Sequence, residues 1–145
     1  MTPDFKFGKG KAKQALALGD LERAVLDTLW DSGEMPGKEV FEKLGSVHKV
    51  QHNTILTVLD RLISKGLVSK QKSGRSNTYR ARLSRDEFAA RVSSPIFEEL
   101  MDVSSHAAMS AFVESAGTDP EKLRELKKMI EDAEKRQSNS KKEKK

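Results

Sequence analysis

Apolar residues at helical spacing predict three helices in the first half of the chain. The spacing is clearest in the third segment, where Ile55, Val58, Leu59 and Leu62 follow the order i, i+3, i+4 and i+7. A glycine follows each segment, and glycine commonly ends a helix. The predicted helices cover about residues 20–32, 38–44 and 51–65, before Gly33, Gly45 and Gly66.

The pattern then changes to one typical of a β-hairpin. Residues 67–72 and 78–83 flank the turn signal 73–77, which contains Gly74. The second arm alternates, with Tyr79 on one face and Arg80 on the other. Three short helices followed by a hairpin predict a mostly α fold with a small β wing, that is, a winged helix-turn-helix domain. Its third helix would be the recognition helix.

Helical signals resume after the hairpin. Ser84 and Glu87 have the spacing of a capping box, which predicts a helix from about residue 85. Pro95 should interrupt this helix, or should start a new one that Ser94 caps. The last helix, about 120–136, places apolar residues at intervals of 3, 4 and 3. These residues are Leu123, Leu126, Ile130 and Ala133.

We therefore expect four parts: a flexible basic arm (1–17), the winged-helix domain (18–84), a helical dimerisation region (85–136) and a disordered basic tail (137–145). About 50 residues in two or three helices cannot close a core alone. The simplest solution is a twofold homodimer, and the alternative is that these helices fold back on their own first domain. The expected dimer contacts are Phe97, Leu100, Met109, Phe112, Leu123, Leu126 and Ile130.

Charge is distributed unevenly along the chain. The net charge is +5, but residues 49–85 hold nine basic side chains against the single acid Asp60, which gives +8. The neighbouring segments 14–48 and 86–134 sum to −4 and −7. A basic block between acidic blocks is expected where one face of a protein meets phosphates.

Several classes of protein receive little support. The chain has no cysteine, no apolar run near the roughly 20 residues that span a bilayer, and no apolar N-terminal signal. We therefore expect a cytoplasmic protein without membrane insertion. His48 and His52 lack further ligands at metal-binding spacing, and no catalytic motif is present. We predict no metal, no cofactor and no enzymatic activity.

Asn53, Thr57 and Arg61 share the polar face of the third helix. Asn can bond adenine, Arg can bond guanine, and a Thr methyl can touch thymine, although each could instead bond phosphate or simply face solvent. The basic hairpin behind the helix favours DNA over a solvated face. The candidate DNA contacts are Gln51, Asn53, Thr54, Thr57, Arg61, Lys70, Lys72, Gly74, Arg75 and Arg80.

Three stretches resemble the penicillinase-repressor (BlaI/MecI/CopY) family. They are residues 18–30, which end in Trp30, residues 53–67, and the Gly74-Arg75 pair with Tyr79. The resemblance runs from about 18 to 136 and is most specific in the first 85 residues. It implies a winged-helix repressor that binds operator dyads on double-stranded DNA as a homodimer through its C-terminal helices.

The resemblance does not identify the inducing signal. The β-lactam-responsive members are cleaved at an Asn-Phe bond after a membrane sensor-protease is triggered, and none of Asn53, Asn77 and Asn139 precedes Phe. The copper-responsive members carry a C-terminal cysteine motif, which this chain lacks. Any upstream sensor stays unknown. Two other functions stay open: a non-specific architectural DNA- or RNA-binding protein, and a winged-helix protein-interaction module.

Overall fold

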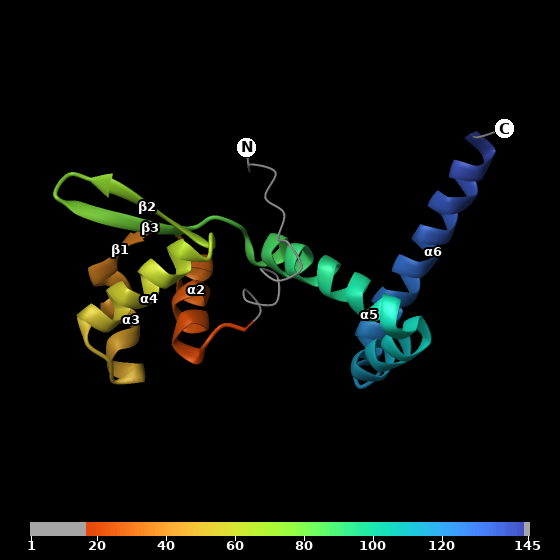
Figure 1. The fold of residues 1–145 in the computed structure, drawn as a ribbon, viewed down its shortest axis with the longest axis horizontal. Helices are drawn as coiled ribbons and strands as arrows, with labels where there is room; N and C mark the ends of the chain where they lie inside the picture. Colours follow the sequence, from red (N-terminus) through yellow and green to blue (C-terminus); the bar gives the residue numbers. More distant parts are fainter. Residues whose placement is uncertain (1–16, 144–145) are drawn as a thin grey trace. The chain divides into compact units, whose positions relative to one another are not determined.

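The computed structural model describes residues 17–143, and the arm expected at 1–17 therefore lies almost wholly outside the described residues. The chain divides into two compact units, Met1–Ile96 and Phe97–Lys145. Figure 1 labels the helices and strands of both units.

The first unit has the predicted winged-helix architecture. Its elements are α2 (Asp20–Ser32), β1 (Met35–Pro36), α3 (Gly37–His48), α4 (His52–Ser64), β2 (Val68–Ser73), β3 (Ser76–Ala81) and the start of α5 (Arg85–Ala116). The three strands form an antiparallel sheet in the order β1-β3-β2. The hairpin β2–β3 is the predicted wing. The two-residue strand β1 was not predicted, because it is too short to show an alternation.

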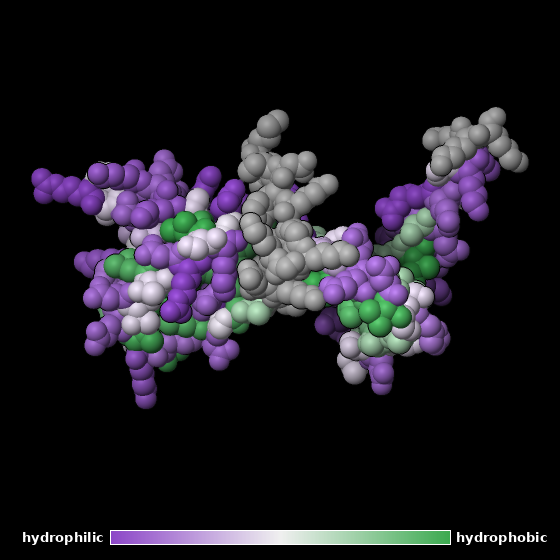
Figure 2. All heavy atoms as spheres, viewed as in Figure 1, coloured by the Kyte–Doolittle hydropathy of each residue, from purple (hydrophilic) through white to green (hydrophobic). Residues whose placement is uncertain are grey.

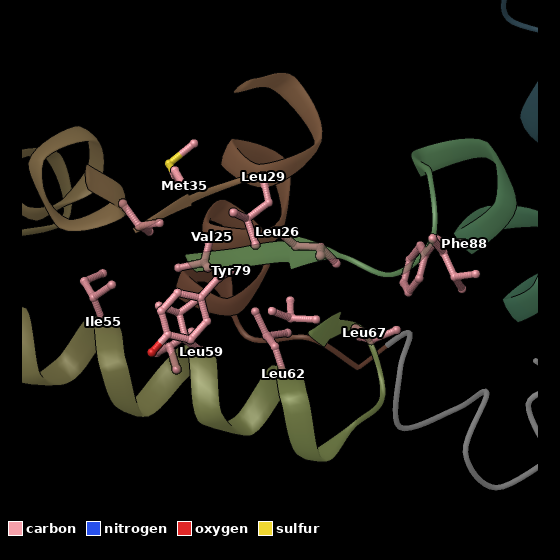
Figure 3. Close-up of a cluster of buried hydrophobic side chains, with 14 of the residues drawn as sticks. Val25, Leu26, Leu29, Met35, Ile55, Leu59, Leu62, Leu67, Tyr79 and Phe88 are labelled. Atoms are coloured by element: carbon pink, nitrogen blue, oxygen red, sulfur yellow. The ribbon is translucent and has the colours of Figure 1, made fainter. Parts of the chain in front are cut away.

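A hydrophobic core lies between the three helices and the sheet, as Figure 3 shows. Ile55, Leu59 and Leu62 are fully buried, and they lie on the α4 stripe that the sequence predicted. Tyr79, which is 5% exposed, points from β3 toward this stripe (Figure 3). Burial of each aliphatic side chain of the α4 stripe contributes about 1.5–3 kcal/mol, so the stripe fixes which face of α4 is left outside.

Gly45 does not end the second helix, so this prediction was wrong. Helix α3 continues to His48 and ends where Lys49 adopts a left-handed conformation with φ of 53°. Gly45 is buried inside the helix, and a Cβ there would lie 2.5 Å from Cε2 of Phe41. This glycine makes room for an aromatic ring one turn earlier.

The wing turn is tighter than the expected segment 73–77. Ser73 pairs with Ser76, which leaves Gly74 and Arg75 as a two-residue loop. Gly74 has φ of 64°, and a glycine at the first position is what a type II′ hairpin turn requires. The predicted alternation is confirmed, because Tyr79 is buried while Arg80 is exposed.

Helix α5 begins with the predicted capping box. The Ser84 hydroxyl accepts a bond from the backbone N–H of Glu87 at 3.1 Å, and the Glu87 carboxylate accepts one from the Ser84 N–H at 3.4 Å. Phe88 and Val92 are buried in the core of the first unit. The compact unit therefore extends to Ile96, beyond the boundary expected at residue 84.

Pro95 lies inside α5, so the interruption predicted at 94–95 was wrong. Val92 and Ile96 pack against the core on either side of it and hold the helix there. The break falls instead at Ser104, with φ of −161° and ψ of 104°. The Ser104 hydroxyl accepts a bond from the backbone N–H of Ala107 at 3.3 Å, as a helix cap does.

The second unit contains the rest of α5 and helix α6 (Pro120–Glu143). Helix α6 continues past Arg136, so residues 137–143 are helical where disorder was expected. This stretch contains neither glycine nor proline, which would break the helix. No residue from 97 to 142 is buried. Figure 2 shows apolar surface over the helices of this unit.

Candidate nucleic-acid interface

Helix α4 presents a polar face to the outside of the first unit. Asn53, Thr54, Thr57 and Arg61 are all exposed, while the opposite stripe is buried. The Thr57 hydroxyl donates to the backbone carbonyl of Asn53 at 2.9 Å. Its hydrogen is therefore used inside the helix, and its oxygen can only accept a bond from a partner.

The N-terminus of α4 is built by the turn that joins it to α3. Gln51 is the extended residue before the helix, and its carbonyl accepts bonds from the N–H groups of Thr54 and Ile55 at 3.1 and 3.3 Å. The rings of Phe41 and His52 meet edge to face at 5.5 Å and join the two helices. No acidic residue lies in the first turn of α4, so the helix does not neutralise its own positive dipole end.

An ion pair holds the other end of α4. The Lys65 ammonium donates to the Glu22 carboxylate on α2 at 2.6 Å, and the two side chains are only 27% and 14% exposed. Sequence reasoning did not find this pair, because its members are 43 positions apart. Lys65 belongs to the basic block but points its charge into the unit.

Arg85, another member of the basic block, also has partners within the first unit. Its guanidinium donates to Asp31 at 2.9 Å and to Asp27 at 3.4 Å. The charge of +8 counted along residues 49–85 therefore overstates what this face offers to an anion. At least two of its nine cations neutralise acids of α2.

The strand register sorts the basic residues of the wing by sheet face. Lys70 pairs with Tyr79, so it shares the face that covers the core, and Lys72 follows on that face. Arg80 lies on the opposite face, where its Nε donates to the Ser69 hydroxyl at 3.3 Å. Gly74 and Arg75 are exposed at the tip. Figure 2 shows hydrophilic side chains covering the wing.

A second bond braces the wing at its base. The Thr78 hydroxyl on β3 donates to the Glu34 carboxylate at 2.7 Å, next to the point where β1 joins the sheet. Glu34 immediately precedes β1, and no sequence pattern marked it. The contact ties the central strand of the sheet to the segment between α2 and α3.

Tyr79 of β3 and Asp60 of α4 interact electrostatically. Burial is the main reason that the pKa of Tyr79 lies above its usual value, and the negative charge of Asp60 on α4 raises it further. The phenol therefore stays neutral at ordinary pH and packs as an apolar ring. Asp60 is exposed on the same side of α4 as Asn53 and Thr57.

Residues 17–143 contain no group of three or more His, Asp or Glu side chains arranged to hold a metal ion. Within the same residues, no helix combines the length and the apolar character needed to cross a bilayer.

A helix-turn-helix whose second helix is exposed along a polar face, followed by a basic hairpin, defines the winged-helix class of DNA-binding domains. Within this class the chain belongs to the penicillinase repressor family, whose pattern matches residues 18–132. The family assignment agrees with the resemblance drawn from the sequence.

Individual relatives are similar over most of the chain. The transcriptional regulator BlaI of Mycobacterium tuberculosis is 38% identical over 104 residues, which are 70% of this chain and 75% of the relative. The penicillinase repressor of Bacillus licheniformis is 23% identical over 120 residues, which are 83% and 94% of the two chains. Among solved structures, the monomeric form of B. licheniformis BlaI with the blaP half-operator is 28% identical. It covers 48% of this chain and 85% of the other, with a TM-score of 0.43.

Proposed function

We propose that this protein represses transcription in the cytoplasm as a homodimer, and that it binds a palindromic operator with one winged-helix unit on each half-site. Membership of the penicillinase repressor family makes the chain a sequence-specific DNA-binding repressor. The proposal adds the dimer, the palindrome and the residues that contact DNA.

The exposed polar face of α4 carries the proposal. Asn53, Thr57 and Arg61 lie along one side of a helix whose other side is fixed by the core. A helix of this size fits the major groove, where Asn and Arg can bond base edges. Thr54 and Gln51, at the N-terminus of α4, would contact the groove or the adjoining phosphates.

The wing supplies phosphate contacts in this proposal. Lys70, Lys72, Arg75 and Arg80 are exposed, and Gly74 keeps the tip narrow enough to approach a sugar-phosphate backbone. These contacts position the protein without reading sequence.

The second unit would form the dimer. Its helices leave ten large apolar side chains between 38% and 82% exposed and bury none of them fully. Within this unit, Phe97, Met109 and Phe112 of α5 line a cavity of about 300 Å³ together with Leu126 and Ile130 of α6. Leu100 and Leu123 are also exposed. A continuous apolar surface of this kind is typical of an interface.

The function can be tested with DNA duplexes that the wild-type protein selects from a random pool. The affinity for these selected duplexes is then measured. The wild type should bind selected duplexes far more tightly than scrambled ones, with affinity falling steeply as salt rises. Arg61→Ala should weaken this preference by about 1–3 kcal/mol, while Lys43→Gln on α3 removes one charge and should leave the preference intact. Equal affinity for selected and scrambled DNA would contradict sequence-specific repression and favour non-specific binding.

Light scattering tests the dimer. Leu126→Asp combined with Ile130→Asp should convert the protein to monomers, because each substitution buries a charge in the proposed interface. Lys128→Asp, on the opposite side of α6, is the matched control and should remain dimeric. A dimer that survives the double substitution would place the interface elsewhere.

A further inference from the structure

Trp30, near the end of α2, contacts the segment that follows the wing. Its indole N–H donates to the backbone carbonyl of Leu83 at 2.8 Å, across 53 positions of sequence. Its ring packs against that of Phe88 with centroids 5.4 Å apart. The guanidinium carbon of Arg85 lies 5.2 Å from the centre of the same ring, within the range of a cation–π contact.

Arg85 joins this aromatic contact to an acidic pair. It bonds Asp31 at 2.9 Å and Asp27 at 3.4 Å, both on α2. Arg23 also pairs with Asp27, at 3.2 Å, and its guanidinium carbon lies 6.0 Å from the centre of the Trp30 ring. The bond to Asp31 is the main reason that the pKa of Arg85 lies above its usual value, although desolvation opposes it.

The same turn of α5 is fixed in two further ways. The Ser84–Glu87 capping box defines where the helix begins, and Phe88 and Val92 are buried in the core. We call Trp30, Arg85, Asp27 and Asp31 the α2–α5 joint. Burial alone would hold α5 against the core, but the directional bonds of the joint also fix its rotation and its starting point.

We propose that Trp30 and Arg85 are positioning residues whose joint fixes the start of α5 on α2 and thereby sets which half-site spacings the dimer accepts. The inference rests on the proposed function, because spacing has meaning only for a dimer on two half-sites. Helix α5 is the chain's route from the winged-helix unit to the proposed dimer helices.

Two binding units on a flexible tether find half-sites at many separations, whereas units on a stiff tether gain affinity only at the separation that matches it. A joint that removes freedom at the start of α5 narrows the range of acceptable separations. Neither Trp30 nor Arg85 needs to touch DNA for this effect.

The experiment measures dimer binding to three duplexes built from the DNA that the wild type selects: a half-site, the full dyad, and a dyad with about five inserted base pairs, half a helical turn. The variants are Trp30→Phe, which keeps a ring but loses the N–H donor, Arg85→Gln, and both together. Lys43→Gln is the control, because it removes a charge from the same unit outside the joint.

For the wild type and Lys43→Gln, the insertion should lower affinity for the dyad by about 100-fold, because the second winged-helix unit no longer reaches its half-site. For the double variant the loss should shrink to about tenfold or less, with half-site affinity unchanged within about twofold. In Arg85→Gln the fluorescence of Trp30, the single tryptophan, reports whether the joint has loosened.

The inference would be overturned by a double variant that is folded by circular dichroism and still loses as much affinity on the insertion as the wild type does. An equal loss of half-site and full-site affinity would also overturn it, because this would indicate a general loss of fold. The proposed function would fail differently, because the wild type itself would then bind the full dyad no more tightly than the half-site.

Discussion

Gly37 lies where three elements of the winged-helix unit meet, and replacing it with alanine should destabilise the protein. A Cβ at this position would lie 2.9 Å from Cδ2 of Leu56 on α4, 3.4 Å from Cε2 of Tyr79 on β3 and 3.7 Å from Cδ1 of Leu59. Gly37→Ala therefore inserts a methyl group between α3, α4 and the sheet.

The expected cost follows from these distances. Ordinary carbon contacts begin near 3.4 Å, so the Leu56 methyl must move away by about 0.5 Å. Overpacking a closed site costs about 1–3 kcal/mol. Loss of the glycine's freedom in the unfolded chain offsets about 0.4–1 kcal/mol of this. The difference between these two ranges is centred near 1 kcal/mol, so we expect Gly37→Ala to lower the free energy of unfolding by about 1 kcal/mol.

Urea unfolding followed by the fluorescence of Trp30 measures this change, since Trp30 belongs to the same unit. In a Leu56→Ala background the obstructing methyl is absent, so the same substitution at Gly37 should cost almost nothing. Gly19→Ala is the control, because the nearest atom to its Cβ is 3.9 Å away. Two results would refute this explanation. One is a Gly37→Ala variant as stable as the wild type, and the other is an equal loss of unfolding free energy in the wild-type and Leu56→Ala backgrounds.

Three further predictions concern single contacts. Absorbance titration of Tyr79, the single tyrosine, should find its pKa above the usual value of about 10, and Asp60→Asn should lower it. Because the pKa of Tyr79 is higher in the folded than in the unfolded protein, the neutral phenol contributes its full stabilisation below about pH 10. This contribution to the free energy of unfolding is lost as the pH rises through the folded pKa, which urea unfolding across that range can check. Lys65→Met should cost about 1–3 kcal/mol in urea unfolding, because it leaves the 14%-exposed Glu22 carboxylate without its partner. Arg75→Ala should lower the slope of log affinity against log salt by about 1 without changing stability, and an unchanged slope would place the wing tip off the DNA.

The sequence predicted those parts of the fold that depend on local periodicity. The stripe from Ile55 to Leu62 placed α4 correctly, because a helix repeats its buried face every three to four residues. Strand β1 escaped prediction because it exists only through its pairing with β3, where Met35 lies opposite Tyr79. Gly45 was misread because a glycine that ends a helix and one that accommodates a ring look alike in sequence.

In the candidate interface, too, the features set by local periodicity could be predicted and those set by tertiary contacts could not. The polar face of α4 follows from helical spacing, so its exposed residues could be named in advance. The availability of each cation could not be predicted, because Lys65 and Arg85 bond acids 43 and 54 positions away. Charge counted along the chain is a local quantity, whereas ion pairing is decided by the tertiary fold.

The exposed apolar helices of the second unit have a consequence for how such a protein would be used in a cell. From residue 97 to 142 no side chain is buried, so in the proposed dimer the order of this segment would depend on a second copy. At low abundance, the amount of paired protein rises with the square of the total. Each cell division that dilutes the protein would then release its promoters more sharply than a monomeric repressor could, which makes abundance itself an input to regulation.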